Sequence, residues 1–191
     1  TKDIDTLLGW EATKIDRANK TVEVKDLHSD EVKVLPYDKL VIATGATNFK
    51  PPIKNIDAKG VFTMKTPDDA VAMQAYIKEN GVESAVVIGA GLIGMETAEA
   101  FEVDEEGKVT AVVTDKGTVE AQMVLVAVGV RPVVDLAKDC GLEVEKAIVV
   151  NEYCQTSDPD IYAAGDAVQT KNLVSGQMGV LPLAGPANKQ G

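Results

Sequence analysis

Cysteine, histidine and aromatic residues are scarce in this chain of 191 residues, which has two cysteines, one histidine and 4% aromatic residues. The two cysteines, Cys140 and Cys154, are too few for a disulfide-stapled secreted domain, so we expect a cytoplasmic protein. Because His28 is the only histidine, neither a zinc cluster of recognised spacing nor a Ser–His–acid triad can be assembled. The aromatic residues are too scattered to form a stacking platform for nucleic acid.

Long apolar runs and excess positive charge are also missing. The longest uncharged apolar stretch, 84–95, has 12 residues, well short of the roughly 20 that a membrane-spanning helix needs. Asp and Glu number 30 against 19 Lys and Arg, which gives a net charge of −11. Such a surface repels nucleic-acid phosphates and anionic lipids. We therefore expect a soluble protein that binds neither nucleic acid nor membrane. The chain begins at Thr1 without a signal segment, and we expect it to be a piece of a longer protein.

The pattern of apolar residues predicts strands that alternate with helices. Strand-like runs lie at 21–24, 32–35, 40–43, 85–88, 109–113, 119–128, 148–150 and 161–164. The run 40–43 is continuously apolar, as a fully buried parallel strand would be. A helix is expected over 67–80, because Thr66 can cap its start and Gly81 its end. Further helical runs are expected at 91–101 and 135–138.

The strongest local signal is Gly89-x-Gly91-x-x-Gly94, between a predicted strand and a predicted helix. In a dinucleotide-binding loop these glycines permit a tight turn, a close approach to pyrophosphate and close helix packing. A structural tight turn is the alternative. Asp115 lies 21 residues after Gly94, where an acid that binds the ribose is expected. We do not assign that role to Asp115, because Asp-Lys-Gly directly before another strand is typical of a hairpin.

Four segments together resemble the FAD-dependent pyridine nucleotide–disulfide oxidoreductases. They are YDKLVIATGA (37–46), VIGAGLIGME (87–96), VAVGVRP (126–132) and IYAAGDA (161–167). The ending LPLAGPANKQG (181–191) is similar to the branch that holds NADH oxidases, NADH peroxidases and coenzyme A disulfide reductases, with their persulfide-reducing relatives.

The resemblance implies an α/β fold class. The chain would contain parts of two Rossmann-like three-layer domains, one binding FAD and one binding NAD(P), with short antiparallel β-meanders. Residues 1–48 and 133–191 would form the FAD-binding portion and residues 67–132 the NAD(P)-binding portion. Residues 49–66, which contain two adjacent prolines, would form a linker.

The resemblance also implies which residues meet the cofactors. On the FAD side these are Thr44 and Gly45 at the pyrophosphate, Asp166 and Ala167 at the ribityl chain, and Pro182, Leu183 and Ala184 near the flavin ring. On the nicotinamide side they are Gly89, Gly91, Ile93, Gly94, Glu96 and Gly129. No catalytic residue and no metal ligand is assigned. A carboxylate at Asp166 makes physical sense, because a buried sugar hydroxyl needs an acceptor.

The chain departs from the family pattern at its start, in its middle and at its end. The family's FAD-binding glycine loop, the redox cysteine that follows it and the dimerisation domain are absent, and we expect Cys140 and Cys154 to be ordinary buried thiols. After 91–101 the family continues with a second strand and the ribose acid, whereas 102–108 resembles the turn of a later hairpin. A segment is therefore missing near 101–104. Either the chain is shortened, or the sequence joins two pieces across residues that it does not show, and we favour the second.

These features predict an FAD-dependent oxidoreductase. A hydride would pass from NAD(P)H to the flavin and on to a small-molecule acceptor: a disulfide, a persulfide, a peroxide or O2. The parent protein would be a cytoplasmic homodimer. Two alternatives stay open, an inactive nucleotide-binding fragment and an NAD(H)-sensing module of the same fold. The residues present identify neither the acceptor nor the preference between NADH and NADPH.

Overall fold

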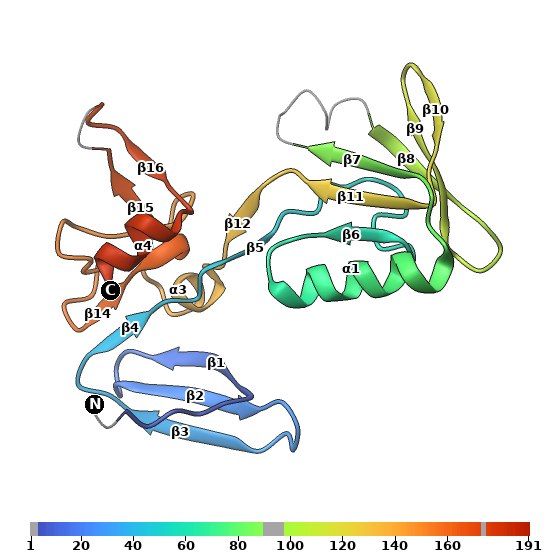
Figure 1. The fold of residues 1–191 in the computed structure, drawn as a ribbon. Helices are drawn as coiled ribbons and strands as arrows, with labels where there is room; N and C mark the ends of the chain where they lie inside the picture. Colours follow the sequence, from blue (N-terminus) through green and yellow to red (C-terminus); the bar gives the residue numbers. More distant parts are fainter. Residues whose placement is uncertain (1–3, 90–97, 173–174) are drawn as a thin grey trace. The chain divides into compact units, whose positions relative to one another are not determined.

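The computed structural model describes residues 4–89, 98–172 and 175–191, and the chain divides into two units (Figure 1). The first unit comprises Thr1–Ala46 and Pro132–Gly191, and the second comprises Thr47–Arg131. Each unit has its own cluster of buried apolar side chains. The fold is mixed α/β with more strands than helices. None of the helices in the described ranges is long and apolar enough to cross a membrane.

A three-stranded antiparallel meander begins the first unit. Its strands are β1 (Trp10–Asp16), β2 (Thr21–Asp26) and β3 (Val32–Pro36), in the order β1-β2-β3. Ile15 and Val24 are buried, whereas Val34 on β3 is exposed. The short helix α3 (Asp135–Asp139) packs against β1. The predicted strands at 21–24 and 32–35 and the predicted helix at 135–138 are confirmed.

The first unit also contains a pair of parallel strands. Predicted FAD-side residues come shortly after each of these strands in the chain. The strands are β4 (Leu40–Ile42) and β14 (Ile161–Ala163), with Leu40 opposite Ile161 and Ile42 opposite Ala163. The prediction of a fully buried strand at 40–43 is wrong for one face, because Val41 is 61% exposed. Among the described residues β4 pairs with β14 alone. An apolar groove of about 260 Å³ lies along β4, lined in part by Leu136 of α3.

The rest of the first unit lies after α3 in the chain. It consists of β13 (Ile148–Val149), the 3-10 helix η1 (Gly165–Ala167), β15 (Val168–Lys171), β16 (Met178–Val180) and α4 (Ala184–Gln190). The sheet order is β13-β15-β16, with β13 parallel and β16 antiparallel to β15.

Ion pairs tie the meander to the start of β14. The Asp160 carboxylate lies 2.5 Å from the Lys20 ammonium and 2.5 Å from the Lys39 ammonium. Hydrogen bonds from these two lysines lower the pKa of the Asp160 carboxyl to about 2. Nearby, the Arg17 guanidinium donates to the Asp158 carboxylate at 2.7 Å. These contacts hold the turn between β1 and β2 to the loop that leads into β14.

The second unit is built on a parallel sheet. Its strands are β6 (Val61–Thr63), β7 (Ala85–Gly89) and β11 (Met123–Ala127), in the order β6-β11-β7. Val124 and Val126 are buried in its core. Val87 of β7 is 62% exposed, so β7 is less buried than its apolar sequence predicts.

Helix α1 (Pro67–Asn80) starts and ends as the sequence predicts. Thr66 and Asp69 form a reciprocal capping box, and Gly81 ends the helix with φ +59°. Left-handed backbone of this kind favours glycine, which lacks a Cβ. The ring of Tyr76 packs edge-on against Phe62 of β6, with centroids 5.2 Å apart. This contact seats the helix on the parallel sheet.

An antiparallel meander completes the second unit. It contains β8 (Ala98–Val103), β9 (Val109–Thr114) and β10 (Gly117–Glu120), in the order β10-β9-β8. The helix predicted over 91–101 is therefore wrong from residue 98 onward, because pairing with β9 overrides the helix propensity of that sequence; residues 91–97 lie outside the described residues. A turn lies at 104–108 within the predicted range 102–108, since Asp104 accepts backbone hydrogen bonds from Glu106 and Lys108, whereas residues 102 and 103 belong to β8. Strand β8 includes residues 101–103, and its pairing with β9 shifts register between Glu102 and Val103.

Part of the stretch 49–66 packs into the second unit. Ile53 is buried in the core of the second unit, and β6 pairs with β11. The predicted single run at 119–128 is two strands, β10 and β11, separated by residues that bond elsewhere: the Ala121 amide donates to the Thr110 carbonyl. The short strands β5 (Ala46–Asn48) and β12 (Val130–Pro132) pair where the chain leaves and re-enters the first unit.

Candidate functional site

The carboxyl ends of β4 and β14 meet at one edge of the sheet in the first unit. Because the two strands are parallel and Ile42 lies opposite Ala163, the residues that follow them, Thr44-Gly45 and Gly165-Asp166, lie beyond the same edge. In open α/β sheets ligands bind outside the carboxyl ends of the strands. The geometry thus brings four predicted FAD-side positions together, Thr44, Gly45, Asp166 and Ala167.

Backbone geometry at this edge is fixed by glycine and by a side-chain hydrogen bond. Gly45 has φ +67°, with no atom within 4 Å of the place where a Cβ would lie. The Thr44 hydroxyl donates to the Val133 carbonyl at 2.6 Å. Its proton is therefore already used, and the hydroxyl oxygen can only accept from a ligand. Gly45 leaves open space for one.

Asp166 is the one acid among the predicted FAD-side residues. It lies in η1 directly after Gly165, whose φ is +79°. The side chain is half-buried, and no group in the described part of the chain donates a hydrogen bond to its carboxylate. Ala167, the next residue, is fully buried in the core of the first unit, so its side chain packs rather than faces a ligand.

The predicted residues Pro182, Leu183 and Ala184 lie at the start of α4. All three are exposed, and Leu183 is the N-cap residue of the helix. The other end of α4 contacts the edge that carries Asp166, because the Gly165 amide donates to the Gln190 side-chain oxygen at 2.8 Å. A helix rises about 1.5 Å per residue, so the three residues start roughly 9 Å along the axis from that contact. Sequence analysis did not identify Gln190.

A second edge of the same kind lies in the second unit. Gly89 ends β7 opposite Ala127 of the parallel strand β11, and Gly129 follows two residues later with φ +104°. The Gly129 carbonyl accepts a hydrogen bond of 3.0 Å from the Phe49 amide. Gly89 and Gly129 therefore lie beyond one edge. The other predicted nicotinamide-side residues, Gly91, Ile93, Gly94 and Glu96, lie outside the described residues.

Asp115 lies in a hairpin, away from the end of any parallel strand. Thr114 pairs with Gly117 across the turn between β9 and β10, and Gly117 has φ +133°. The Thr114 hydroxyl donates to the Gly117 carbonyl at 2.9 Å. The hairpin interpretation is confirmed.

The two cysteines are half-buried rather than fully buried. Cys140 ends α3, and its thiol donates to the Ala137 carbonyl at 3.3 Å. Burial raises the pKa of the Cys140 thiol. The thiolate is the nucleophilic form of cysteine, so this environment suits a structural role.

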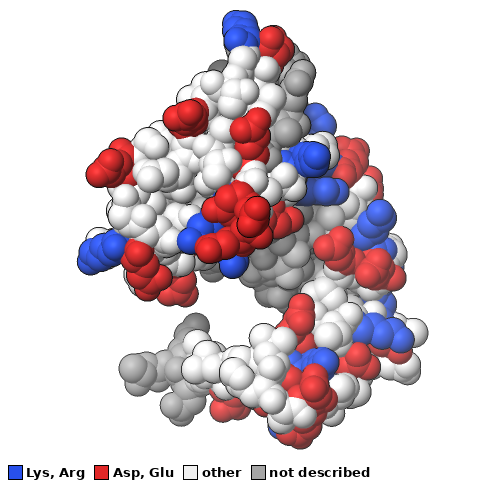
Figure 2. All heavy atoms as spheres, turned by 90° about the vertical axis from the view of Figure 1, so that its right-hand side faces the viewer, with Lys and Arg blue, Asp and Glu red and all other residues white. Residues whose placement is uncertain are grey.

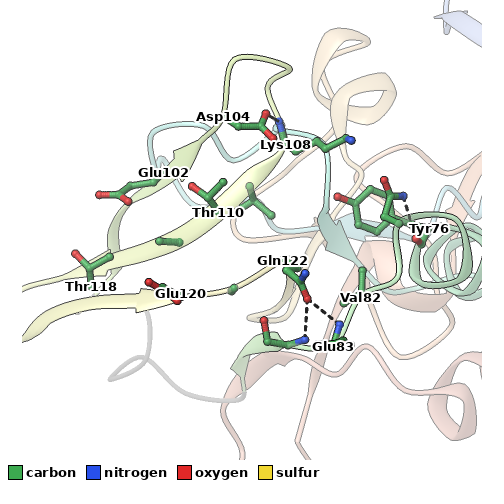
Figure 3. Close-up of a pocket in the computed structure, with 15 residues that line it drawn as sticks. Tyr76, Val82, Glu83, Glu102, Asp104, Lys108, Thr110, Thr118, Glu120 and Gln122 are labelled. Atoms are coloured by element: carbon green, nitrogen blue, oxygen red, sulfur yellow. Dashed lines mark hydrogen bonds between the residues drawn. The ribbon is translucent and has the colours of Figure 1, made fainter.

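The hollow shown in Figure 3 holds none of the predicted site residues. It has a volume of about 850 Å³ and lies between the end of α1 and the strands β8–β10. Its charged lining residues are Glu83, Glu102, Asp104, Lys108 and Glu120. Four acids against one lysine disfavour an anionic cofactor. In the described part of the chain no group of three or more acids, histidines or cysteines could hold a metal ion.

The surface charge agrees with the composition. On the face shown in Figure 2, acidic side chains are spread widely, and basic side chains lie singly or in small groups among them. A nucleic-acid footprint would need a basic stripe or patch. This face presents none among the residues described.

Known proteins resemble the chain along its whole length. A family model for the pyridine nucleotide-disulphide oxidoreductases matches residues 1–103 and 99–191. An NAD(P)H sulfur oxidoreductase (CoA-dependent) of Pyrococcus abyssi is 33% identical, covering 100% of this chain and 52% of the relative. An NADH oxidase of Methanocaldococcus jannaschii is also 33% identical, covering 100% and 53%. The chain thus spans about half the length of the curated relatives it matches.

Solved structures agree in fold. An FAD-dependent pyridine nucleotide-disulphide oxidoreductase from Desulfovibrio vulgaris shares 34% identity with a TM-score of 0.83, over 97% of this chain and 59% of that one. An NAD-dependent persulfide reductase from A. fulgidus shares 34% identity with a TM-score of 0.85, over 95% of this chain and 42% of that one.

The matches also show a difference in length. The alignment with the Pyrococcus abyssi protein extends over 238 residues, 47 more than the 191 of this chain, so at least 47 positions of the alignment have no counterpart here. The two pieces of the family match overlap only at 99–103, which lies within β8. The two parts of the chain together carry the sequence and the fold of one family: the chain belongs to the pyridine nucleotide-disulphide oxidoreductases.

Proposed function

We propose that this chain is part of an FAD-dependent oxidoreductase. A hydride would pass from NAD(P)H to the flavin and on to a small-molecule acceptor, a disulfide, a persulfide, a peroxide or O2. The printed names of relatives support the class, since they include an NADH oxidase and a CoA-dependent NAD(P)H sulfur oxidoreductase. When bound, flavin accepts a hydride and passes electrons onward, while the protein orients the cofactors and excludes water.

The observation that carries this proposal is the environment of Asp166. Its half-buried carboxylate, which accepts no hydrogen bond from the described residues, suits the hydroxyls of a ribityl chain, because each hydroxyl can donate to an ionised acceptor. Gly45, open on its Cβ side, leaves room for a pyrophosphate beside it. The residues present therefore fit the flavin side of the cofactor pair, and Pro182, Leu183 and Ala184 would approach the flavin ring.

On the nicotinamide side, two of the six predicted residues, Gly89 and Gly129, are described by the structure. We propose that Gly89 and Gly129 approach the dinucleotide with their backbones, together with Gly91, Ile93, Gly94 and Glu96. A dinucleotide fold also needs an acid at the end of its second strand to bind the ribose. Asp115 does not supply it, because it lies in a hairpin turn.

A second candidate function follows from the difference in length between this chain and its relatives. The alignment with the Pyrococcus abyssi protein contains at least 47 positions that have no counterpart in this chain, and we propose as the alternative that the chain is a nucleotide-binding fragment without turnover of its own, or an NAD(H)-sensing module. The two candidates differ in NADH consumption with flavin and an acceptor present, which the first requires and the second lacks.

Flavin titration tests the main proposal directly. The full chain is titrated with FAD, and flavin fluorescence is followed. Removing one charged acceptor costs about 1.5–3 kcal/mol, so Asp166→Asn should raise the dissociation constant about 10- to 150-fold. Asp135→Asn, on the exposed face of α3, is the control and should bind like the parent chain. A parent chain that binds no FAD, or an Asp166→Asn variant that binds equally well, contradicts the proposal.

We further propose that the parent protein works in the cytoplasm as a homodimer. The low cysteine count favours a reducing compartment, and the dimer rests on the resemblance to the family alone. The mass of the purified parent protein in solution tests the dimer.

A further inference from the structure

The geometry points to Gln190 as a positioning residue for Asp166. Gln190 ends α4, and its side-chain oxygen accepts a hydrogen bond of 2.8 Å from the backbone amide of Gly165, the residue directly before Asp166. This assignment rests on the proposed role of Asp166 in holding a flavin. It adds that the hydrogen bond between Gln190 and Gly165 determines where the Asp166 carboxylate lies.

In the described part of the chain, the Gly165 amide donates to the Gln190 side chain and to no other group. Strand β14 ends at Ala163, and the next amide, that of Ala164, donates to the Ile42 carbonyl of β4. At Gly165 the chain turns away from β4 with φ +79°. The amide is thereby released from the sheet while only partly exposed to water, and a shielded amide without a partner destabilises the fold. Gln190 supplies that partner.

Helix α4 touches the turn at a second point. A Cβ placed on Gly165 would lie 3.9 Å from the Cβ of Ala187. Ala187 and Gln190 are three residues apart, so they lie on the same face of the helix. Two side chains of α4 therefore contact the turn: Ala187 lies next to Gly165, and Gln190 accepts its amide hydrogen bond. Glycine at 165 permits the left-handed turn, and the helix fixes its direction.

The direction of this turn decides the position of the next side chain. The Gly165–Asp166 peptide follows immediately, and Val168 closes η1 by donating to the Gly165 carbonyl. The Asp166 carboxylate receives no hydrogen bond from the described residues, so its position depends on the backbone that carries it. A free rotation of the peptide at Gly165 would move that carboxylate away from a ligand at the sheet edge.

Two variants of the full chain separate positioning from simple packing. Gln190→Met keeps the length of the side chain but removes the acceptor. Gln190→Glu keeps an oxygen that can accept from the Gly165 amide. Lys189→Ala, at an exposed position of the same helix, is the control. Each variant is assayed for FAD affinity by flavin fluorescence, for hydrogen exchange at the Gly165 amide by NMR, and for its melting temperature.

We expect Gln190→Met to weaken FAD binding about tenfold, the effect of about one hydrogen bond, and to speed exchange at Gly165. Gln190→Glu should restore slow exchange and most of the affinity, while Lys189→Ala changes neither. If hydrogen exchange at the Gly165 amide is unchanged in Gln190→Met, the inference is overturned. It is also overturned if the unsubstituted chain binds FAD and Gln190→Met binds it with the same affinity. A parent chain that binds no FAD overturns the proposed function instead, and the exchange rate at Gly165 then still decides whether Gln190 holds the turn.

Discussion

Both units end a pair of parallel strands at one edge, yet the two edges offer different chemistry. In the first unit β4 and β14 lead to a half-buried carboxylate, Asp166, beside Gly45. In the second unit β7 and β11 lead to Gly89 and Gly129. Glycines let a backbone approach phosphate, but they cannot select a sugar. Among the described residues, one pair of strands thus leads to an acid and the other to glycines.

The comparison assumes that each unit folds around its own core, and the largest expected effect tests this. Ile161 is fully buried in the first unit, and Ile161→Ala should lower the free energy of unfolding by about 2–5 kcal/mol. Hydrogen exchange should rise at amides of β4 and β14. Val124→Ala, at a fully buried position of the second unit, is the counterpart and should raise exchange in β7 and β11. Equal exchange increases in both units from Ile161→Ala would break the comparison.

The edge of the second unit depends on glycine at one position more than at the other. Gly129 has φ +104°, so Gly129→Ala should cost about 1–3 kcal/mol through backbone strain. Gly89→Ala is the matched control, because its φ is not positive and its new Cβ would meet Val87 at an ordinary 3.8 Å. Denaturant unfolding measures both variants. If the two substitutions destabilise the chain equally, backbone strain is not what sets Gly129 apart.

The first unit should also show a pH dependence that comes from Asp160. Lys20 and Lys39 lower the pKa of this carboxyl to about 2, so the ion pairs stabilise the fold above about pH 4 and are lost as the pH falls towards 2. The melting temperature of the parent chain should therefore drop more steeply between pH 4 and 2 than that of Asp160→Asn. Asp5→Asn, at an exposed position, should follow the parent chain. Identical slopes for the parent and Asp160→Asn contradict this prediction.

The smallest expected effect is none at all. Since Asp115 lies in the turn between β9 and β10, Asp115→Asn should leave the affinity for NADH unchanged, and the parent chain should bind NADH and NADPH with similar dissociation constants. Titration of nicotinamide fluorescence checks both statements. If the parent chain clearly prefers one dinucleotide and Asp115→Asn abolishes that preference, Asp115 contacts the bound dinucleotide. The second unit would then also supply an acid, and the two edges would not differ in this respect.

The sequence predicted well those elements whose ends are marked by capping or turn residues. Helix α1 could be placed because Thr66 and Gly81 mark its ends, and both act there as caps. The hairpin at Asp115 could be recognised because Gly117 supplies the positive φ that the turn requires. These features depend on a few neighbouring residues, which a sequence displays directly.

Other features depend on residues that are distant in the chain. Residues 98–101 have the composition of a helix, but β9 pairs with them and makes a strand. Val41 and Val87 belong to apolar runs that predict burial, yet both are more than half exposed, because burial is decided by what covers a strand. Gln190 escaped notice since its partner, Gly165, lies 25 residues away, and no local pattern joins a helix end to a turn.

The open side of β4 has a consequence for how the protein behaves at high concentration. Val41 is exposed next to an apolar groove, and in the described residues β4 pairs only with β14. Unpaired strand edges of this kind template association between molecules. The net charge of −11 keeps like molecules apart only within the Debye length, which shrinks from about 10 Å at 0.1 M salt to about 3 Å at 1 M. Colloidal stability should therefore be highest in dilute buffer and decline as salt is added.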